Sequence, residues 1–209
     1  MRRIIQWLLL PIVFIVIGLG WKYPLLGFAV PLTMLVGIVG AFINGRYVCG
    51  NLCPRGAFFD RLVIFISPQK PLPPILRNMT LRLVVLILLM GLMVYRLSQD
   101  LYSPDHWGRV FWLMCAATTM IGIVLAIFIR ARTWCAFCPI GTLGKIISEK
   151  KEKSLLKLDT TKCIGCKLCE KACPMNLPII SKNKTLLING DCIKCGECVA
   201  RCKTQALSF

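Results

Sequence analysis

Four long apolar stretches constrain this chain more than any other feature of its 209 residues. A helix needs about 20 predominantly apolar residues to cross the hydrocarbon core of a bilayer. The mean hydropathy of +0.69 and the apolar fraction of 56% also exceed what soluble domains usually show, which is about half apolar. We therefore predict an α-helical membrane protein with four transmembrane helices, at Ile4–Gly20, Leu25–Asn44, Met79–Ser98 and Val110–Ile129.

Basic residues between these stretches predict how the chain crosses the membrane. One side of the membrane receives Arg2, Arg3, Arg46, Arg55, Arg61, Lys70, Arg77, Arg130, Arg132, Lys145 and Lys150. The other side receives only Lys22 and Arg109, together with Asp100 and Asp105. Because short cytoplasmic loops carry an excess of Lys and Arg, we predict a multi-pass protein of a prokaryotic cytoplasmic (inner) membrane. Both termini are expected in the cytoplasm, and the first helix is expected to stay uncleaved.

The formal net charge is +17, from 26 Lys and Arg against 9 Asp and Glu. Such a balance often indicates a nucleic-acid-binding protein. Here the charges lie at the ends of the apolar stretches and around cysteines rather than in one patch. Arg82 and Arg96 lie near the ends of the third stretch, where we expect their long side chains to reach the membrane interface. We therefore predict the lipid bilayer as a partner and no nucleic acid.

Thirteen cysteines are far more than a chain of this length usually contains. In a small secreted protein they would indicate disulfides. All but Cys115 fall into closely spaced groups, and such groups in a reducing compartment indicate metal ligation. Cys115 stands alone in the fourth apolar stretch, where we expect it only to pack.

Two cysteine runs near the C-terminus have the spacing of iron–sulfur ligands. In two-cluster proteins with this spacing, the fourth cysteine of each run ligates the cluster of the other run. Cluster one is therefore predicted at Cys163, Cys166, Cys169 and Cys202, and cluster two at Cys192, Cys195, Cys198 and Cys173. Zinc is the competing interpretation, but it takes four ligands from paired C-x-x-C units rather than from two interlocked sets. Gly165 and Gly196 suit a close approach of the backbone to the clusters.

Over about Leu155–Phe209 the runs resemble the bacterial two-cluster ferredoxin family. The resemblance implies a small α+β domain with two [4Fe–4S] clusters. Lys203 stands where the second run of that family usually has proline. So short a domain has room for little apolar core, and we expect cluster ligation to hold it together.

A charged connector, Glu149–Lys157, precedes this domain. We therefore predict two domains. Residues 1–148 form a four-helix membrane domain with two Cys-Pro motifs on the cytoplasmic side, and residues 149–209 form the ferredoxin domain.

The two Cys-Pro motifs form an internal repeat. One reads R-Y-V-C-G-N-L-C-P-R-G from Arg46, and the other reads R-T-W-C-A-F-C-P-I-G from Arg132. Each follows a pair of apolar stretches, so the two motifs are expected at the same side of the membrane. Their four cysteines, called the membrane cysteines below, are Cys49, Cys53, Cys135 and Cys138.

The membrane cysteines allow several interpretations. If the second and fourth helices are neighbours, four thiolates meet and can hold a third [4Fe–4S] cluster. A redox-active dithiol close to a quinone, or another metal site, would use the same residues. Small interfacial cysteines that merely pack are the remaining alternative.

The combination of four helices, two C-P motifs and a C-terminal two-cluster ferredoxin resembles the NapH family. Members of that family are membrane-bound quinol dehydrogenase components that serve periplasmic nitrate reductase and related systems. The resemblance implies (mena)quinone as substrate and a redox partner, either another subunit of a membrane complex or a soluble ferredoxin-type protein. The second motif departs from the family, with two residues between Cys135 and Cys138 where three are typical. Membrane ferredoxins of nitrous-oxide reduction and oxidase assembly share the motifs, and likeness of fold does not choose among these systems.

His106 is the only histidine, and it lies beside Asp105 in the predicted outer loop. A transmembrane b-type haem takes axial histidines from within the bundle, so this chain alone is not predicted to be a haem-b quinol oxidase. The two residues are either a proton-handling pair at an outer quinone pocket or solvated loop residues.

We therefore predict a membrane-bound iron–sulfur protein that passes electrons between the (mena)quinol pool and a redox partner, as a quinol dehydrogenase component. Quinol is expected to bind among the helices near the membrane cysteines. Electron flow in either direction agrees with the residues, because the surroundings of a cluster set its potential. The alternatives are an electron-relay subunit without its own substrate, and a cluster-bearing assembly or redox-sensing factor.

Overall fold

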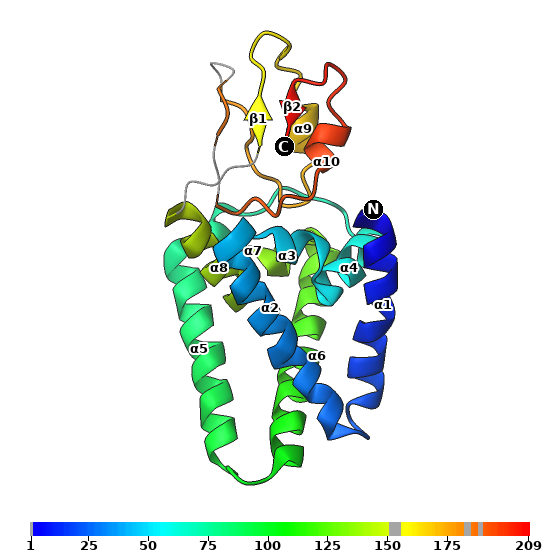
Figure 1. Ribbon diagram of the computed structural model, residues 1–209, viewed down its shortest axis with the longest axis vertical. Coiled ribbons are helices and arrows are strands. Elements are labelled where there is room, and N and C mark those ends of the chain that lie inside the picture. The colour runs from blue at the N-terminus through cyan, green and yellow to red at the C-terminus, as the bar shows by residue number, and fades with distance from the viewer. Residues whose placement is uncertain (1, 151–155, 182–184, 188–189) are drawn as a thin grey trace.

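The computed structural model describes residues 2–150, 156–181, 185–187 and 190–209. Four helical segments in it are long and apolar enough to span a membrane, which confirms the predicted membrane fold. They are α1 (Arg2–Leu19), the 3-10 turn η1 (Pro24–Phe28) continued by α2 (Ala29–Asn44), α5 (Met79–Ser98) and α6 (Pro104–Phe128). Figure 1 shows two hairpins, α1 with α2 and α5 with α6, that turn at the same end of the molecule.

Helix α6 begins at Pro104, earlier than the predicted Val110. The Ser103 side chain accepts a hydrogen bond from the backbone N–H of His106, and Pro104 takes the first helical position. A serine cap followed by proline is a strong helix start, because proline lacks the N–H that would otherwise be unsatisfied there. Asp105 and His106 therefore lie in the first turn of a helix and not in an outer loop.

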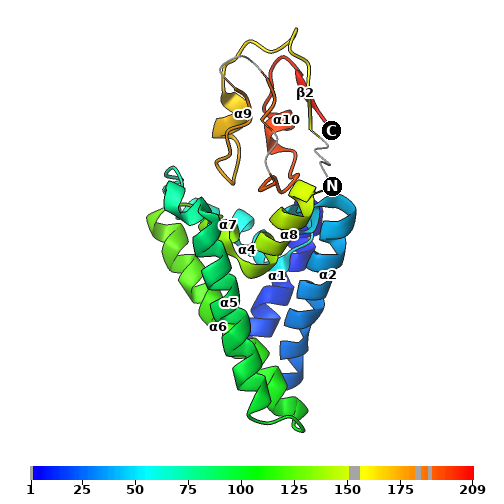
Figure 2. The same cartoon turned by 90° about the vertical axis from the view of Figure 1, so that its left-hand side faces the viewer.

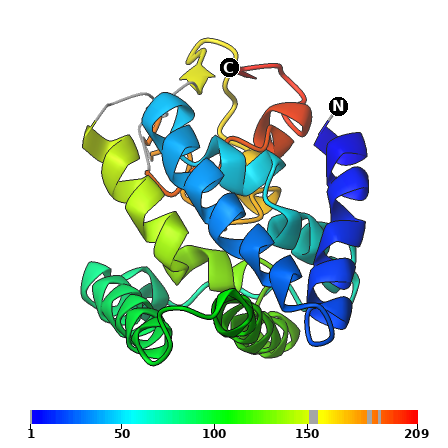
Figure 3. The ribbon, with the colours of Figure 1, turned by 60° about the horizontal axis from the view of Figure 1, so that its bottom comes forward.

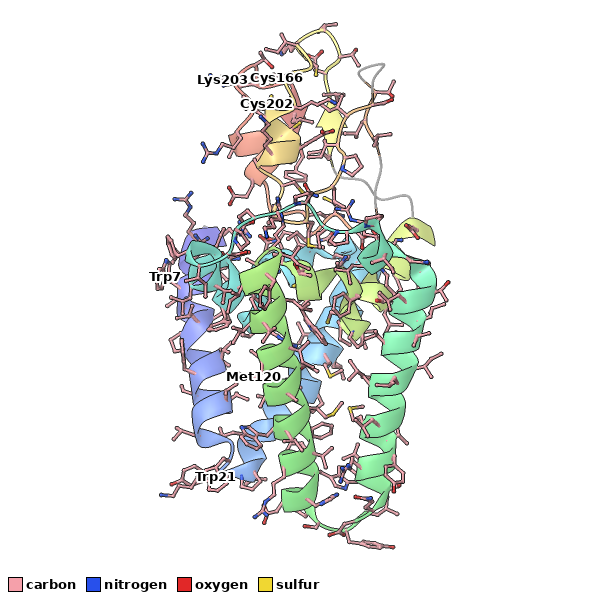
Figure 4. All side chains as sticks on the ribbon, turned by 180° about the vertical axis from the view of Figure 1, so that it is seen from behind. Trp7, Trp21, Met120, Cys166, Cys202 and Lys203 are labelled. Atoms are coloured by element: carbon pink, nitrogen blue, oxygen red, sulfur yellow. The ribbon has the colours of Figure 1, made fainter. Side chains whose placement is uncertain are left out.

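Exposed apolar side chains cover the outside of the four-helix bundle. Figure 4 shows Trp7 and Trp21 towards opposite ends of the bundle, and Met120 on the outer face of α6. The exposed fractions of these side chains are 55%, 76% and 60%. Tryptophan is enriched at both membrane–water interfaces, so this distribution is that of a bundle surrounded by lipid.

Short helices cover the end of the bundle where α2 and α6 finish, called the cysteine end below. After α2 come α3 (Tyr47–Asn51) and α4 (Pro54–Arg61), and after α6 come α7 (Thr133–Phe137) and α8 (Pro139–Lys150). Helix α4 packs against α1, and α8 lies between α2 and α5 (Figure 3). The 3-10 turns η2 (Val63–Phe65) and η3 (Pro74–Arg77) connect α4 to α5. The repeat seen in the sequence is therefore also a repeat of the fold.

The C-terminal domain sits on the cysteine end (Figures 1 and 2). It contains the short helices α9 (Leu168–Lys171) and α10 (Glu197–Ala200), and strands β1 (Lys157–Leu158) and β2 (Leu207–Ser208) pair antiparallel. Its own core is small and consists of Cys169, Ile179, Cys198 and Leu207. These elements confirm the predicted small α+β class. Residues 151–155 of the predicted connector Glu149–Lys157 lie outside the described residues.

A buried carboxylate joins the C-terminal domain to the bundle. Asp191 accepts hydrogen bonds from Arg46 at 2.6 Å and from both terminal nitrogens of Arg82 at 2.7 and 2.8 Å. The Arg82 side chain is 0% exposed, so the expectation that it reaches the membrane interface is wrong. Breaking a buried pair leaves an uncompensated charge, and this carboxylate is shared by two guanidinium groups of the membrane domain.

Further arginines bind the backbone of the C-terminal domain. Arg77 donates to the carbonyl oxygens of Met175 and Asn176. Arg130 donates to the carbonyl oxygen of Cys173 at 2.9 Å. Part of the excess positive charge is therefore used within the molecule to hold its two domains together.

Candidate iron–sulfur site

The Cys-Pro motif places a cysteine at the start of a helix. Cys53 is the capping residue of α4, with extended backbone angles and Pro54 after it. The backbone N–H of Gly56 lies near the Cys53 sulfur and favours its thiolate. The Cys53 side chain does not accept a regular capping hydrogen bond. Cys138 stands in the same way before α8, with the N–H of Gly141 on its sulfur. A helix N-terminus stabilises negative charge, so both positions suit a thiolate.

Two buried arginines lock the two repeats together. Arg46 donates to the carbonyl oxygen of Cys135 at 2.6 Å, and Arg132 donates to the carbonyl oxygen of Cys49 at 3.0 Å. Each arginine precedes the first cysteine of its own repeat by three residues and binds the first cysteine of the other repeat. Arg46 and Arg132 occupy matching positions in the aligned motifs, but from the sequence alone they indicated only the orientation of the chain in the membrane.

The glycine of each motif makes room for the arginine of the other repeat. A Cβ atom on Gly141 would lie 2.5 Å from Nη2 of Arg46, and one on Gly56 would lie 2.8 Å from Nη1 of Arg132. Contacts below about 3 Å would force the guanidinium out of place, because close-packed interiors absorb little extra volume. The C-P-x-G pattern is therefore explained by a helix start and a close arginine contact together.

The four membrane cysteines converge at the cysteine end and line one cavity. Burial raises the pKa of the Cys53 thiol to about 12, and the neighbouring Cys49 adds to the rise. Burial also raises the pKa of Cys138, while the cation of Arg55 partly offsets it. Burial opposes the charged form of Arg132, but Asp60 and Cys135 outweigh it and hold its pKa well above the ordinary value. Fixed positive charge therefore lies beside the membrane cysteines, and burial disfavours the thiolates of Cys53 and Cys138 in the absence of a ligand.

The set predicted for cluster two lies next to the membrane domain and is called the proximal set: Cys173, Cys192, Cys195 and Cys198. Burial raises the pKa of Cys198 to about 12, with further contributions from the other three cysteines. Burial likewise raises the pKa of Cys195 to about 11. The structure thus brings Cys173 from the first run to the three cysteines of the second run.

The set predicted for cluster one lies farther from the bundle and is called the distal set: Cys163, Cys166, Cys169 and Cys202. Figure 4 shows Cys166, Cys202 and Lys203 in the part of the C-terminal domain that faces away from the bundle, called the tip below. The Cys166 side chain is exposed. Burial opposes the thiolate of Cys202, but the Thr204 hydroxyl and nearby backbone N–H groups outweigh it and lower its pKa.

Left-handed backbone turns shape both runs in the same way. Gly165 and Lys194 each follow the first cysteine of a run by two residues, with φ of 74° and 52°. Lys167 and Gly196 each follow the second cysteine directly, with φ of 56° and 80°. The two glycines were identified from the sequence. The two lysines were not, because no sequence pattern marks a lysine that adopts a positive φ.

A shared apolar cluster separates the membrane cysteines from the proximal set. Its centre consists of Leu72, Trp134, Ala136, Phe137, Met175, Leu177 and Ile193. Cys49, Cys135 and Cys138 pack against it, as do Cys173, Cys192 and Cys195. The backbone of Ile193 comes so close to Gly50 that a Cβ there would lie 2.1 Å from its carbonyl oxygen. The three cysteine sets therefore follow one another from the bundle to the tip.

The chemistry of these sets fits iron–sulfur clusters. All thirteen cysteines lie in the described part of the chain, and none forms a disulfide. Among the described residues, no three His, Cys, Asp or Glu side chains converge closely enough to hold a single metal ion. The four thiolates around a [4Fe–4S] cluster bind four different irons, so they need not converge on one point.

A cavity of about 500 Å³ lies among the four long helices, at the inner side of the membrane cysteines. Its wall at the cysteine end includes Arg46, Arg55 and Trp134, and mostly apolar side chains of α1, α2, α5 and α6 form the rest. The polar exceptions on these helices are Thr33, Thr118 and Thr119, whose hydroxyls donate to backbone carbonyl oxygens. Ligand pockets typically enclose about 300–1,000 Å³ and are mostly apolar with a few polar groups. The cavity therefore has the size and lining of a site for a lipophilic ligand.

Cys115 and His106 lie at different places relative to this cavity. Cys115, expected only to pack, lies in the cavity wall. His106 is not part of that wall. Its Nε2 atom lies 2.9 Å from the carbonyl oxygen of Arg96, at the end of the bundle opposite the cysteines.

Comparisons with protein families match most of the regions described above. The family of 4Fe-4S dicluster domains matches residues 162–207. The family of 4Fe-4S binding domains matches twice, at residues 26–72 and 109–155. These two matches coincide with the two repeats and include all four membrane cysteines. No solved structure matches the chain.

Three relatives align with more than four fifths of this chain. Two uncharacterized proteins of Methanocaldococcus jannaschii are 31% and 33% identical to this chain. The first alignment covers 85% of this chain and 70% of the relative, and the second covers 84% and 76%. The ferredoxin-type protein NapH of Haemophilus influenzae is 28% identical, over 81% of this chain and 63% of its own length.

Proposed function

The chain belongs to the NapH-like family of ferredoxin-type membrane proteins and is an iron–sulfur electron-transfer protein, and from that premise we propose that it connects a membrane quinone to a redox partner. In this proposal the ligand is a quinol or menaquinol in the cavity among the helices. The partner is another subunit of a membrane complex or a soluble ferredoxin-type protein that docks at the exposed tip.

The cavity is the observation that carries the proposal. It lies within the part of the bundle that lipid would surround, and its wall holds Cys49, Cys53, Cys135 and Cys138 at one end. A quinone is lipophilic and carries two carbonyl oxygens, so it suits an apolar cavity with a few donors at one end. A relay subunit without its own substrate would have no use for such a space.

We assign the three cysteine sets to three [4Fe–4S] clusters. The membrane cysteines would hold one, the proximal set a second and the distal set a third. Such clusters, when bound, accept and release single electrons. The chain itself supplies buried thiols, the backbone N–H groups of Gly56 and Gly141, and the cations Arg46 and Arg132 beside the membrane cysteines. With four irons per set, we expect about twelve irons per chain.

The order of the sets limits the route but leaves its direction open. The membrane cysteines adjoin the cavity and the proximal set adjoins them, while Cys166 of the distal set is exposed at the tip. Every candidate centre thus lies on one side of the four helices. The loop charges support placing that side in the cytoplasm.

A quinol titration tests the function directly. Anaerobically purified protein with its iron counted is mixed with menadiol, and cluster reduction is followed by EPR and visible absorption. We expect menadiol to reduce the clusters, and the quinone-site inhibitor 2-heptyl-4-hydroxyquinoline N-oxide to block this and to shift a cluster signal. Clusters that dithionite reduces but menadiol and the inhibitor leave unchanged would make the protein a relay or sensing subunit.

Reporter fusions test the orientation independently. Fusions after Phe209 and within the 67–74 loop should report the cytoplasm, and a fusion at Ser103 should report the outside. The opposite pattern would invert the membrane orientation and place the cysteine sets in an oxidising compartment.

A further inference from the structure

The two Cys-Pro motifs differ at one position that faces the cavity. Between proline and glycine the first motif has Arg55, and the second has Ile140. Both side chains line the cavity. The pseudo-symmetric scaffold therefore places a cation on one wall and an apolar side chain on the other. Nothing in the helix start or in the arginine lock requires that difference.

Arg55 differs from Arg46 and Arg132, the two arginines that lock the repeats together. Arg132 binds both oxygens of Asp60, at 2.7 and 2.6 Å, and Arg46 binds Asp191. By contrast, Nε and Nη2 of Arg55 are shielded from solvent and have no hydrogen-bond partner among the described residues. A buried donor without a partner costs free energy, and an acceptor supplied by a ligand would remove that cost.

Trp134 supplies a second donor without a partner at the same place. The guanidinium of Arg55 stacks on its ring, 5.0 Å from the ring centroid. The Trp134 side chain is only 4% exposed and lines the cavity. Its Nε1 atom is buried and has no hydrogen-bond partner within the described residues. Two stacked side chains that line the cysteine end of a mostly apolar cavity thus carry three N–H-bearing nitrogens without a partner among the described residues.

We propose that Arg55 and Trp134 bind a carbonyl oxygen of the quinone and hold its ring beside Cys138. The proposal rests on the function proposed above and names the residues that would fix the ligand. Arg55 lies close enough to Cys138 to favour that thiolate, so an oxygen bound by Arg55 lies at the cysteine end of the cavity. The apolar tail of the quinone then extends along the wall formed by Met90, Met93, Phe111 and Met114.

A different role for Arg55 would be to balance the charge of ligands around Cys138 without touching a quinone. The two roles make different demands on the side chain. Charge balance needs one cation, which lysine also provides. Binding an oxygen through a planar fork of N–H groups needs arginine, because lysine is a point charge with different reach.

Inhibitor binding by the iron-loaded protein separates these roles. The affinity for 2-heptyl-4-hydroxyquinoline N-oxide is measured by quenching of its fluorescence, with iron content and dithionite-reduced EPR spectra recorded for each variant. We expect Arg55→Met to weaken binding about ten- to a hundred-fold, as for a lost hydrogen bond to a charged group. Arg55→Lys should keep full iron and still bind more weakly than the wild type. Trp134→Phe, which keeps the ring but removes the N–H, should weaken binding by a smaller factor.

Arg61→Met is the matched control. It removes a guanidinium from the same helix α4, but Arg61 contacts Gln6 and is absent from the cavity wall. Its inhibitor affinity should equal that of the wild type. Arg55→Lys with full iron and unchanged affinity would overturn the role of Arg55, even if Arg55→Met loses iron. A wild-type protein with full iron that binds no inhibitor would instead overturn the proposed function itself.

Discussion

The C-terminal domain and the membrane domain both place cysteines through an internal duplication, but they do so by different means. In the C-terminal domain, two residues with left-handed backbone angles shape the loop of each run. The fourth cysteine of each run is assigned to the set of the other run, and Cys173 does lie beside Cys198. In the membrane domain each repeat contributes two cysteines, and the arginine of one repeat binds the backbone of the other. The first arrangement yields two separate sets, and the second merges two halves into one.

The two arrangements should respond differently to substitution. The ferredoxin runs depend on local backbone geometry, so a single change there should stay local. The membrane cysteines depend on buried charges that reach across the repeat, so a change in one half should disable both. Substitutions in the two domains can test this contrast between local backbone geometry and buried charges.

The largest effect is expected from the membrane cysteines. Cys53→Ser and Cys138→Ser should each abolish menadiol-dependent reduction as completely as the double variant, because ligands of one centre are strongly non-additive. Each should also lose about four irons, while the ferredoxin EPR signals stay. Cys115→Ser should keep full iron. Single variants with near-normal turnover and iron content would show that the membrane cysteines only pack.

Removing the charge of Asp191 should loosen the contact between the domains. Asp191→Asn leaves the buried Arg46 and Arg82 without a carboxylate, and breaking a buried pair costs about 3–5 kcal/mol. Thermal unfolding in detergent and limited proteolysis between the domains would detect this. Asp159→Asn is the control, because Asp159 and its partner Lys162 are 41% and 61% exposed and an exposed pair is worth at most about 1 kcal/mol. Equal effects of the two substitutions would contradict a buried lock.

A smaller effect is expected from the glycine that faces Arg46. Gly141→Ala places a Cβ 2.5 Å from the guanidinium, and such overpacking typically costs about 1–3 kcal/mol. The loss should appear as a lower unfolding midpoint and as weaker retention of the membrane iron. Gly91→Ala is the control, because a Cβ there would meet no described atom within 4 Å. If both variants behave like the wild type, the close contact is not needed for the lock.

The smallest effect should be a gain in stability. Lys167 adopts φ of 56° on an exposed loop, and a left-handed conformation costs a non-glycine residue about 1–2 kcal/mol. Lys167→Gly should recover part of that cost, up to about 1 kcal/mol once the greater freedom of the unfolded chain is counted. Lys171→Gly, within α9, should destabilise by about 1 kcal/mol instead. Chemical denaturation of the iron-loaded protein compares the two, and a loss with Lys167→Gly would contradict a locally strained loop.

The membrane helices and the two ferredoxin cysteine runs could be predicted from the sequence alone. Both are local patterns. Hydropathy over about 20 residues decides whether a helix can span a bilayer, and three cysteines spaced by two residues can wrap one cluster whatever surrounds them. The boundary of α6 was missed because the cap at Ser103 outweighed the polar composition of the turn that follows.

Contacts between residues far apart in the sequence could not be predicted and became known from the folded structure. Arg82 was expected at the membrane interface, yet it binds Asp191 from the other domain. Arg46, Arg55 and Arg132 all occur in the Cys-Pro motifs. Arg46 and Arg132 bind carboxylates, whereas Arg55 has no such partner among the described residues. A buried charge is stable only with a partner. Which partner lies within reach depends on how the two hairpins and the small C-terminal domain pack together.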